Sequence, residues 1–91
     1  MFKVIFSKSY QRRAIKFFKV HTELISQYEK VVKILEKNPF HPSLRLHKLQ
    51  PPMQAFHSIS INMKYRISLE LILNDKEIIL INVGTHDQVY R

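Results

Sequence analysis

The spacing of apolar residues changes once along the chain, near residue 40, and this change restricts the folds open to it. From residue 10 to residue 37, apolar side chains recur every three or four positions, which is the period of an amphipathic helix. From residue 55 to residue 62 they alternate with polar ones, which is the period of a strand. Helices followed by strands predict an α+β fold, in which a helix pair packs on a mostly antiparallel sheet.

The first half of the chain predicts one strand and two helices. The opening segment FKVIF is rich in strand formers. Ser7 or Ser9 offers an N-cap for a first helix over Tyr10–Val20, and Thr22 offers one for a second helix over Glu23–Lys37. We expect these helices to form an αα-hairpin.

The second half predicts strands separated by turns, because prolines end the second helix and interrupt the segments that follow. The expected strands cover Leu44–Leu49, Ala55–Asn62, Tyr65–Leu73 and Glu77–Val83. A hairpin turn at residues 74–76 joins the last two, and Gly84 ends the final strand before a polar tail over residues 85–91. The predicted order in this single domain, residues 1–91, is β-α-α-β-β-β-β, with four or five strands in the sheet.

Composition excludes several classes of site. The chain has no cysteine, which removes disulfides, thiolate nucleophiles and cysteine-based zinc sites. It has one glycine, whereas dinucleotide and phosphate-binding glycine loops need at least two. The five histidines form no HExxH or HxxxH pair, so neither a metal nor a cofactor is expected. No apolar run reaches the roughly 18–20 residues of a membrane span, and we expect a soluble cytoplasmic protein with no membrane partner.

The charge of the chain is strongly asymmetric. Fifteen lysines and arginines face seven acidic residues, and residues 1–50 hold eleven of the bases but only three of the acids. The stretch Met1–Thr22 has six bases and no acid. Such a field attracts polyanions or an acidic protein, although a solubilising surface is the simpler explanation.

Cleavage of an RNA phosphodiester needs three groups that this chain can supply without a metal. A base must take the 2′-hydroxyl proton, a cation must stabilise the phosphorane, and an acid must protonate the 5′-oxygen. The candidates are a cluster at Arg45, His47 and Lys48, a lone arginine at Arg66, and the C-terminal pair His86 and Tyr90.

Each candidate near the C-terminus also has a purely structural explanation. Arg66 could form a salt bridge with Glu70 or Glu77. His86 could be an exposed histidine of the tail, and Tyr90 could pack on the sheet as an apolar plug. The residues alone therefore indicate a nucleic-acid-binding protein, with ribonuclease activity as one of the open alternatives.

Three segments together resemble a known family of toxins. They are NPFHPSLRLHKLQ at residues 38–50, KYRI at residues 64–67 and INVGTHDQVYR at residues 81–91. They are similar to the RelE/YafQ/ParE superfamily of type II toxin–antitoxin systems, and most closely to its mRNA-interferase branch. The resemblance implies a microbial RNase-like fold and ribosome-dependent mRNA cleavage that inhibits translation. In that reaction the 2′-hydroxyl attacks the phosphodiester without a metal and leaves a 2′,3′-cyclic phosphate and a 5′-hydroxyl.

The resemblance also implies roles for particular residues. Arg66 matches the arginine that holds the scissile phosphate, and His86 matches a catalytic histidine that acts as general acid or base. Tyr90 matches an aromatic residue that orients the substrate, and His47 matches a histidine of YafQ-like members. The expected RNA-binding residues are Arg45, Lys48, His57, Ser60 and Lys64.

The chain departs from the family pattern where active members carry cations. Ser58 and Ser60 lie at two such positions, and Asn82 stands where YafQ-like proteins have an arginine. Lost cations weaken phosphate stabilisation. Two alternatives therefore remain open: a ParE-like inhibitor of DNA gyrase with the same fold, and an RNA- or ribosome-binding module that does not cleave.

The implied partners are mRNA on the ribosome and an acidic antitoxin. The basic helix Tyr10–Val20 and an edge of the sheet are the surfaces expected to bind the antitoxin, since a disordered segment can wrap a large area and add a strand. We expect a monomer when the protein is free and a hetero-oligomer with the antitoxin.

Overall fold

The computed structural model describes residues 1–53 and 55–89. It is an α+β fold in which the predicted order of strands and helices is confirmed. The strands and helices are β1 (Lys3–Phe6), α1 (Lys8–Val20), α2 (Ile25–Lys37), β2 (His47–Lys48), β3 (His57–Ser60), β4 (Tyr65–Ile72), β5 (Glu77–Thr85) and α3 (His86–Val89). Two 3₁₀ turns, η1 (Thr22–Leu24) and η2 (Pro42–Leu44), precede α2 and β2. No helix in the described ranges is long and apolar enough to cross a membrane.

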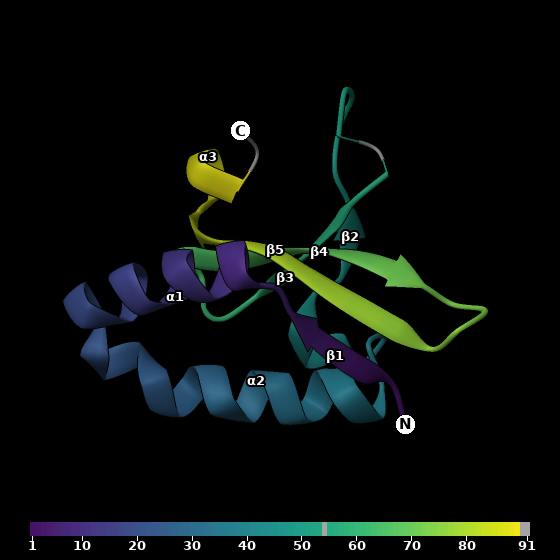
Figure 1. Cartoon of the computed structure of the whole chain (residues 1–91), viewed down its shortest axis with the longest axis horizontal. Coiled ribbons are helices and arrows are strands. Elements are labelled where there is room, and N and C mark those ends of the chain that lie inside the picture. Colours follow the sequence, from purple (N-terminus) through teal and green to yellow (C-terminus); the bar gives the residue numbers. More distant parts are fainter. Residues whose placement is uncertain (54, 90–91) are drawn as a thin grey trace.

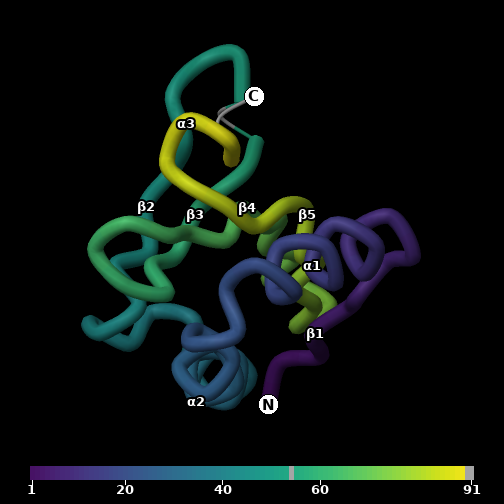
Figure 2. The backbone as a smooth tube through the Cα atoms, turned by 90° about the vertical axis from the view of Figure 1, so that its left-hand side faces the viewer, coloured from purple at the N-terminus to yellow at the C-terminus, as the bar shows by residue number. Residues whose placement is uncertain are grey.

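The five strands form one sheet in the order β1-β5-β4-β3-β2. β1 runs parallel to β5, and the other pairs are antiparallel. Figure 1 shows α2 on one side of this sheet and the short α3 on the other. In the end-on view of Figure 2, α1 lies beside β5, away from β2 and β3.

The hydrophobic core lies between the sheet and the two long helices. Tyr10 from α1, Leu35 from α2, and Ile59 and Ile67 from the central strands are all fully buried there. The Tyr10 and Tyr28 hydroxyls are 2.8 Å apart and satisfy each other inside the helix pair. Burial raises the pKa of Tyr10 above its usual range, and the neighbouring Tyr28 raises it further.

The helix starts were predicted with partial success. Ser7 is the N-cap of α1, and its hydroxyl accepts a hydrogen bond from the Tyr10 amide. The prediction for Thr22 was wrong, because residues 22–24 form a 3₁₀ turn and α2 begins only at Ile25. The Leu24 amide donates to the His21 carbonyl, so backbone groups rather than a side-chain cap make this connection.

Two predicted strands are shorter in the structure. The edge strand expected over Leu44–Leu49 is reduced to His47–Lys48, because Arg45 takes a left-handed conformation with φ of 51° directly after η2. The strand expected over Ala55–Asn62 is reduced to His57–Ser60. The hairpin turn between β4 and β5 is confirmed at residues 73–76.

The predicted end of the last strand was wrong. β5 continues through Gly84 to Thr85, and Gly84 pairs with Arg66 inside the sheet. The expected polar tail begins instead with α3, whose Val89 is 1% exposed. A Cβ at position 84 would overlap the amide oxygen of Gln88, so the glycine allows α3 to pack closely on the sheet. Tyr90 and Arg91 of that tail lie outside the described residues.

Candidate functional site

The face of the sheet that points away from the core carries polar residues from four strands. The strand register places them in one row across the sheet: His47, Ser58, Ser68 and Asn82. A neighbouring row contains Ser60, Arg66 and Gly84. Because side chains alternate along a strand, the residues between these positions, such as Ile59 and Ile67, point into the core. We call this surface the polar face.

His47 is held at both ring nitrogens. Its Nδ1 lies 3.0 Å from the Arg45 carbonyl oxygen, and because a carbonyl only accepts, Nδ1 is the donor. In the neutral ring Nε2 is then unprotonated, and it lies 3.2 Å from the Ser58 hydroxyl. This tautomer gives His47 a nitrogen on the polar face that can accept a proton.

Arg66 lies on the same face, half-buried in β4. Its Nη1 donates to the Ser60 hydroxyl at 3.2 Å. In the described ranges Arg66 makes no ion pair with Glu70 or Glu77. The salt bridge considered from the sequence is therefore not formed. Glu70 is four residues along the same strand, about 13 Å away at the usual rise per residue. The rest of the guanidinium can therefore bind an anion.

The short helix α3 is fixed over β5 by side chains. The side-chain amide of Asn82 donates to the backbone carbonyl of Gln88 at 3.2 Å. The backbone amide of Thr85 donates to the side-chain oxygen of Gln88 at 2.8 Å. His86 opens the helix, exposed, with its Nδ1 3.5 Å from an Asp87 carboxylate oxygen. The predicted tail histidine thus stands on an ordered element, and Asn82, expected only as a lost cation, ties that element to the sheet.

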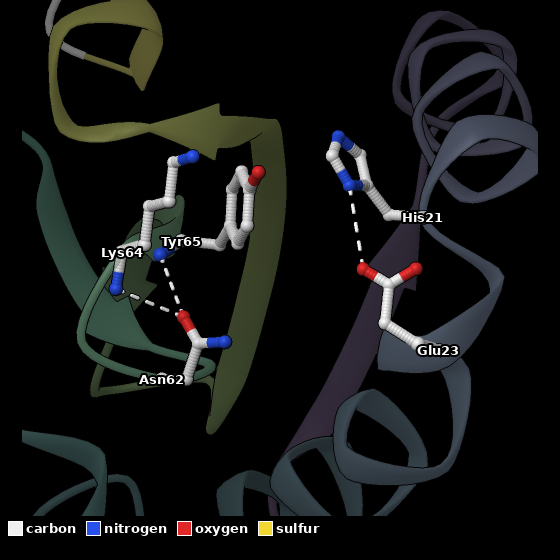
Figure 3. Close-up of polar contacts among 5 residues, drawn as sticks. All are labelled: His21, Glu23, Asn62, Lys64 and Tyr65. Carbon is white, nitrogen blue, oxygen red and sulfur yellow. Dashed lines mark hydrogen bonds and ion pairs between the residues drawn. The ribbon is translucent and has the colours of Figure 1, made fainter.

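Some predicted RNA-binding residues lie away from the polar face. Lys48 and His57 pair with each other across β2 and β3 and point to the opposite side from His47. Lys64 is exposed in the turn before β4, with its ammonium 5.4 Å from the centre of the Tyr65 ring (Figure 3). Ser60 is buried. Tyr90 lies outside the described residues.

Comparison with known proteins finds the likeness in structure rather than in sequence. No family model and no curated protein matches the chain. YafQ from E. coli superposes with a TM-score of 0.78 at 14% identity over the whole of both chains, and YafQ in the E. coli DinJ-YafQ complex gives 0.77. The YoeB/ParE toxin from Agrobacterium tumefaciens gives 0.71 at 14% identity, over 92% of this chain and 98% of that one. The chain has the fold of the RelE/YafQ/ParE toxins.

One relative with this toxin fold was solved with a bound metal. It is a copper-bound mutant toxin from Helicobacter pylori, with a TM-score of 0.71 and 25% identity over 98% of this chain and 99% of that one. In residues 1–53 and 55–89 of the present chain, no group of three or more histidine, cysteine or acidic side chains could hold a metal ion.

Sequence reasoning did not foresee the contacts of three residues at this candidate site. Ser58 contacts His47, Ser60 contacts Arg66, and Gln88 fixes α3. Ser58 and Ser60 were taken for lost cations, and Ser60 also for an RNA contact, yet each is buried and hydrogen-bonds to a candidate side chain. The alternation around Ile59 placed both serines on one face, but the partners they would meet depend on the strand register.

Ser68 gives a first testable prediction. It lies in the centre of the polar face, fully buried, and its hydroxyl has no hydrogen-bond partner. A buried hydroxyl without a partner costs stability, so the Ser68→Ala variant is expected to be more stable by about 1 kcal/mol. Urea unfolding of both proteins measures the difference in free energy. A variant that is less stable by a similar amount would show that water or another group satisfies the hydroxyl.

His57 gives a second prediction, on the pH dependence of stability. Burial lowers the pKa of His57 below its usual range, and the positive charges of Lys48 and His47 lower it further. As the pH falls below about 6.5, the unfolded chain takes up a proton that His57 in the folded protein does not, so stability is lost. The His57→Gln variant should lose less stability than the wild type between pH 7.5 and pH 5.5 in thermal melts. Equal losses in both proteins would contradict this assignment.

Proposed function

We propose that this protein is the toxin of a type II toxin–antitoxin pair and that it cleaves mRNA on the ribosome without a metal. Its fold is that of YafQ, which has been crystallised with DinJ as a toxin–antitoxin complex. Fold alone does not carry the activity, because one fold hosts many functions. The observation that carries it is that His47 and Arg66 lie on one face of the sheet, in neighbouring rows and on either side of β3.

In the proposed reaction, Arg66 binds the scissile phosphate and stabilises the charge that grows on its oxygens. The Nε2 atom of His47 takes the proton from the 2′-hydroxyl as that oxygen attacks phosphorus. The bond to the 5′-oxygen breaks, and the leaving oxygen receives a proton from protonated His86. The products are a 2′,3′-cyclic phosphate and a 5′-hydroxyl, and no electron or metal is needed to balance the step.

Ser58 and Ser60 stand where active members of the family carry cations. They support the proposed roles of His47 and Arg66 in a different way. Ser58 and Ser60 are uncharged, so they add little to phosphate binding, but each fixes one of the reacting side chains. Removing a charged donor from such a site costs about 2–4 kcal/mol in the barrier. We therefore expect a slower nuclease than one with lysine or arginine at these positions.

The proposed partner is an acidic antitoxin that binds along α1. That helix has no acid in its first turn, and Arg12, Arg13, Lys16 and Lys19 are all exposed on it. Arg13 and Lys16 line a cleft of about 450 Å³ with Val20, His21 and Gln88, beside the part of β5 that extends past β1. Cations beside exposed apolar surface suit an acidic, amphipathic segment.

The test is primer extension on a defined mRNA bound to programmed ribosomes. Wild-type protein is expected to give cuts in phase with the codons, whereas the Arg66→Ala and His86→Ala variants give none. Lys3→Ala is the matched control, since Lys3 is an exposed cation at the opposite edge of the sheet. Intact mRNA with tight, salt-sensitive ribosome binding would replace the proposal with a binding module. DNA damage with intact mRNA would replace it with gyrase inhibition.

A further inference from the structure

Ser68 is a buried polar residue that the proposed reaction does not use. Its side chain is fully buried on β4, and its hydroxyl finds no hydrogen-bond partner among the residues that the structure describes. Its neighbours in the row across the polar face are Ser58 on β3 and Asn82 on β5. Buried hydroxyl groups are nearly always hydrogen-bonded in folded proteins, so this exception points to a second state in which the group has a partner.

The hydrogen bonds of the row have a fixed direction while His47 is neutral. The His47 Nδ1 atom donates to the Arg45 carbonyl, so the unprotonated Nε2 atom can only accept. The Ser58 hydroxyl, 3.2 Å from Nε2, is therefore the donor of the second bond. In this state the Ser58 hydrogen is used on His47.

Protonation of His47 reverses the bond to Ser58. Once Nε2 carries a proton it can only donate, so the Ser58 oxygen must accept and the Ser58 hydrogen must turn to another acceptor. Bulk water does not supply one, because Ser58 is fully buried. The backbone carbonyls of the central strands β3 and β4 already accept from the strands beside them. A side-chain acceptor is therefore needed.

The Ser68 oxygen is placed to be that acceptor. Ser58 and Ser68 are direct partners in the register of β3 and β4. The Cβ atoms of such partners lie about 4.5–5.5 Å apart, a spacing at which hydroxyl groups on neighbouring strands form hydrogen bonds. Ser68 can thus receive the hydrogen that Ser58 releases when His47 is protonated.

Several charged or titratable groups of the described residues surround this row. They are Arg45 and Lys48 on the segment of His47, His57 on β3, Arg66 and Glu70 on β4, and His86 and Asp87 at the start of α3. All of them are unchanged when only Ser68 is replaced. A change in the titration of His47 in such a variant therefore reports the loss of the hydroxyl.

We propose that Ser68 is a positioning residue that stabilises protonated His47 through Ser58. In the proposed reaction His47 becomes protonated as it takes the 2′-hydroxyl proton, so the Ser68 oxygen accepts from Ser58 as the transition state forms. This catalytic part of the inference rests on the proposed function, whereas the effect on His47 is a property of the free protein. The hydroxyl that lowers stability in the neutral state then stabilises the charged state.

The first measurement needs no RNA. Nuclear magnetic resonance of protein labelled in the imidazole rings follows the titration of each histidine, and the His47→Gln variant identifies the His47 signal by its loss. In Ser68→Ala the midpoint of the His47 titration should fall by about half a pH unit, which is an affinity for the proton about threefold weaker. An unchanged midpoint in the folded variant would overturn the inference.

Three further variants separate the hydroxyl from packing. Ser68→Thr keeps the hydroxyl and should keep the wild-type midpoint, whereas Ser68→Cys, with a weak acceptor of similar size, should behave as Ser68→Ala does. Ser26→Ala is the matched control, since Ser26 is an exposed serine on α2, and it should leave the midpoint unchanged. A midpoint that follows side-chain size rather than the hydroxyl would assign Ser68 a packing role and overturn the inference.

Stability should depend on pH in the matching direction. Above about pH 7.5 the imidazoles are neutral, and Ser68→Ala is expected to be the more stable protein. As the pH falls below about 6, the folded wild type takes up a proton at His47 more readily than the folded variant, so the advantage of the variant should shrink. Urea unfolding at both pH values measures it, and a constant advantage would contradict the inference.

Cleavage distinguishes this inference from the nuclease itself. Single-turnover rates on programmed ribosomes should rise with pH as His47 loses its proton, and in Ser68→Ala the rise should come about half a pH unit lower, to a plateau about threefold slower. Cleavage with the same pH profile in both proteins would refute the role of Ser68 and leave the nuclease standing. A shifted His47 titration without cleavage by the wild type would support the role of Ser68 and refute the nuclease.

Discussion

Replacing Arg66 with alanine is expected to lower the rate of mRNA cleavage by about 10²–10³-fold. Arg66 is the cation of the polar face that is half-buried and held in place, through its bond to Ser60. A positioned cation stabilises charge that appears only in the transition state, so its loss affects the rate more than binding. Single-turnover cleavage on programmed ribosomes, with protein in excess, measures the effect.

Two companion variants separate charge from geometry. Arg66→Lys keeps the charge but loses the second hydrogen-bonding arm, and it should recover only part of the rate. Ser60→Ala removes the bond that orients Arg66 and should cost less than Arg66→Ala. All variants should keep the wild-type melting temperature within a few degrees. If Arg66→Ala cleaves as fast as the wild type while folded, the proposed phosphate site is wrong.

Replacing Gly84 with alanine is expected to destabilise the protein by about 1–3 kcal/mol and to reduce cleavage about a hundredfold. The new Cβ would overlap the Gln88 side-chain oxygen and would lie 3.0 Å from the Gln88 Cβ. Gln88 must move, and with it the bond from the Thr85 amide that fixes α3. Because His86 opens α3, its imidazole would shift as well. Urea unfolding and the cleavage assay measure the two effects.

A double variant tests this explanation. Gly84→Ala combined with Gln88→Ala removes the overlapping oxygen, and it should regain part of the lost stability because only the contact between the two Cβ atoms remains tight. Additive losses in the double variant would show that the glycine is needed for another reason. Gln88→Ala alone provides the reference for the lost bond to Thr85.

Long elements were predictable from the sequence because burial repeats along them. The spacing of residues such as Val31 and Leu35 in α2, and of Ile59 in β3, identified the core and the order of elements. The spacing of Ile78, Leu80 and Val83 in β5 was harder to interpret, since a bulge opposite Ser68 shifts the alternation by one residue. Such a shift depends on the partner strand and leaves no local signal.

Short elements were not predictable for the same physical reason. The 3₁₀ turns and α3 span three or four residues each, too few to show a period, and packing rather than propensity stabilises them. The candidate site likewise has one part that the sequence predicts and one part that depends on tertiary contacts. His47, Arg66 and His86 could be chosen by residue type, but the contacts of His47 and Arg66 come from the register of β2, β3 and β4.

In β3 and β4, side chains alternate regularly between the two sides of the sheet. Odd positions such as Ile59 and Ile67 build the core, while even positions such as Ser58 and Arg66 face the other side. Core residues and polar-face residues therefore occupy different positions of the same strand. Substitutions that alter the proposed chemistry and substitutions that alter the core then fall at different positions of the same strand. The chain keeps the YafQ fold at 14% identity, and the polar face is the place where new specificities could be grafted onto this scaffold.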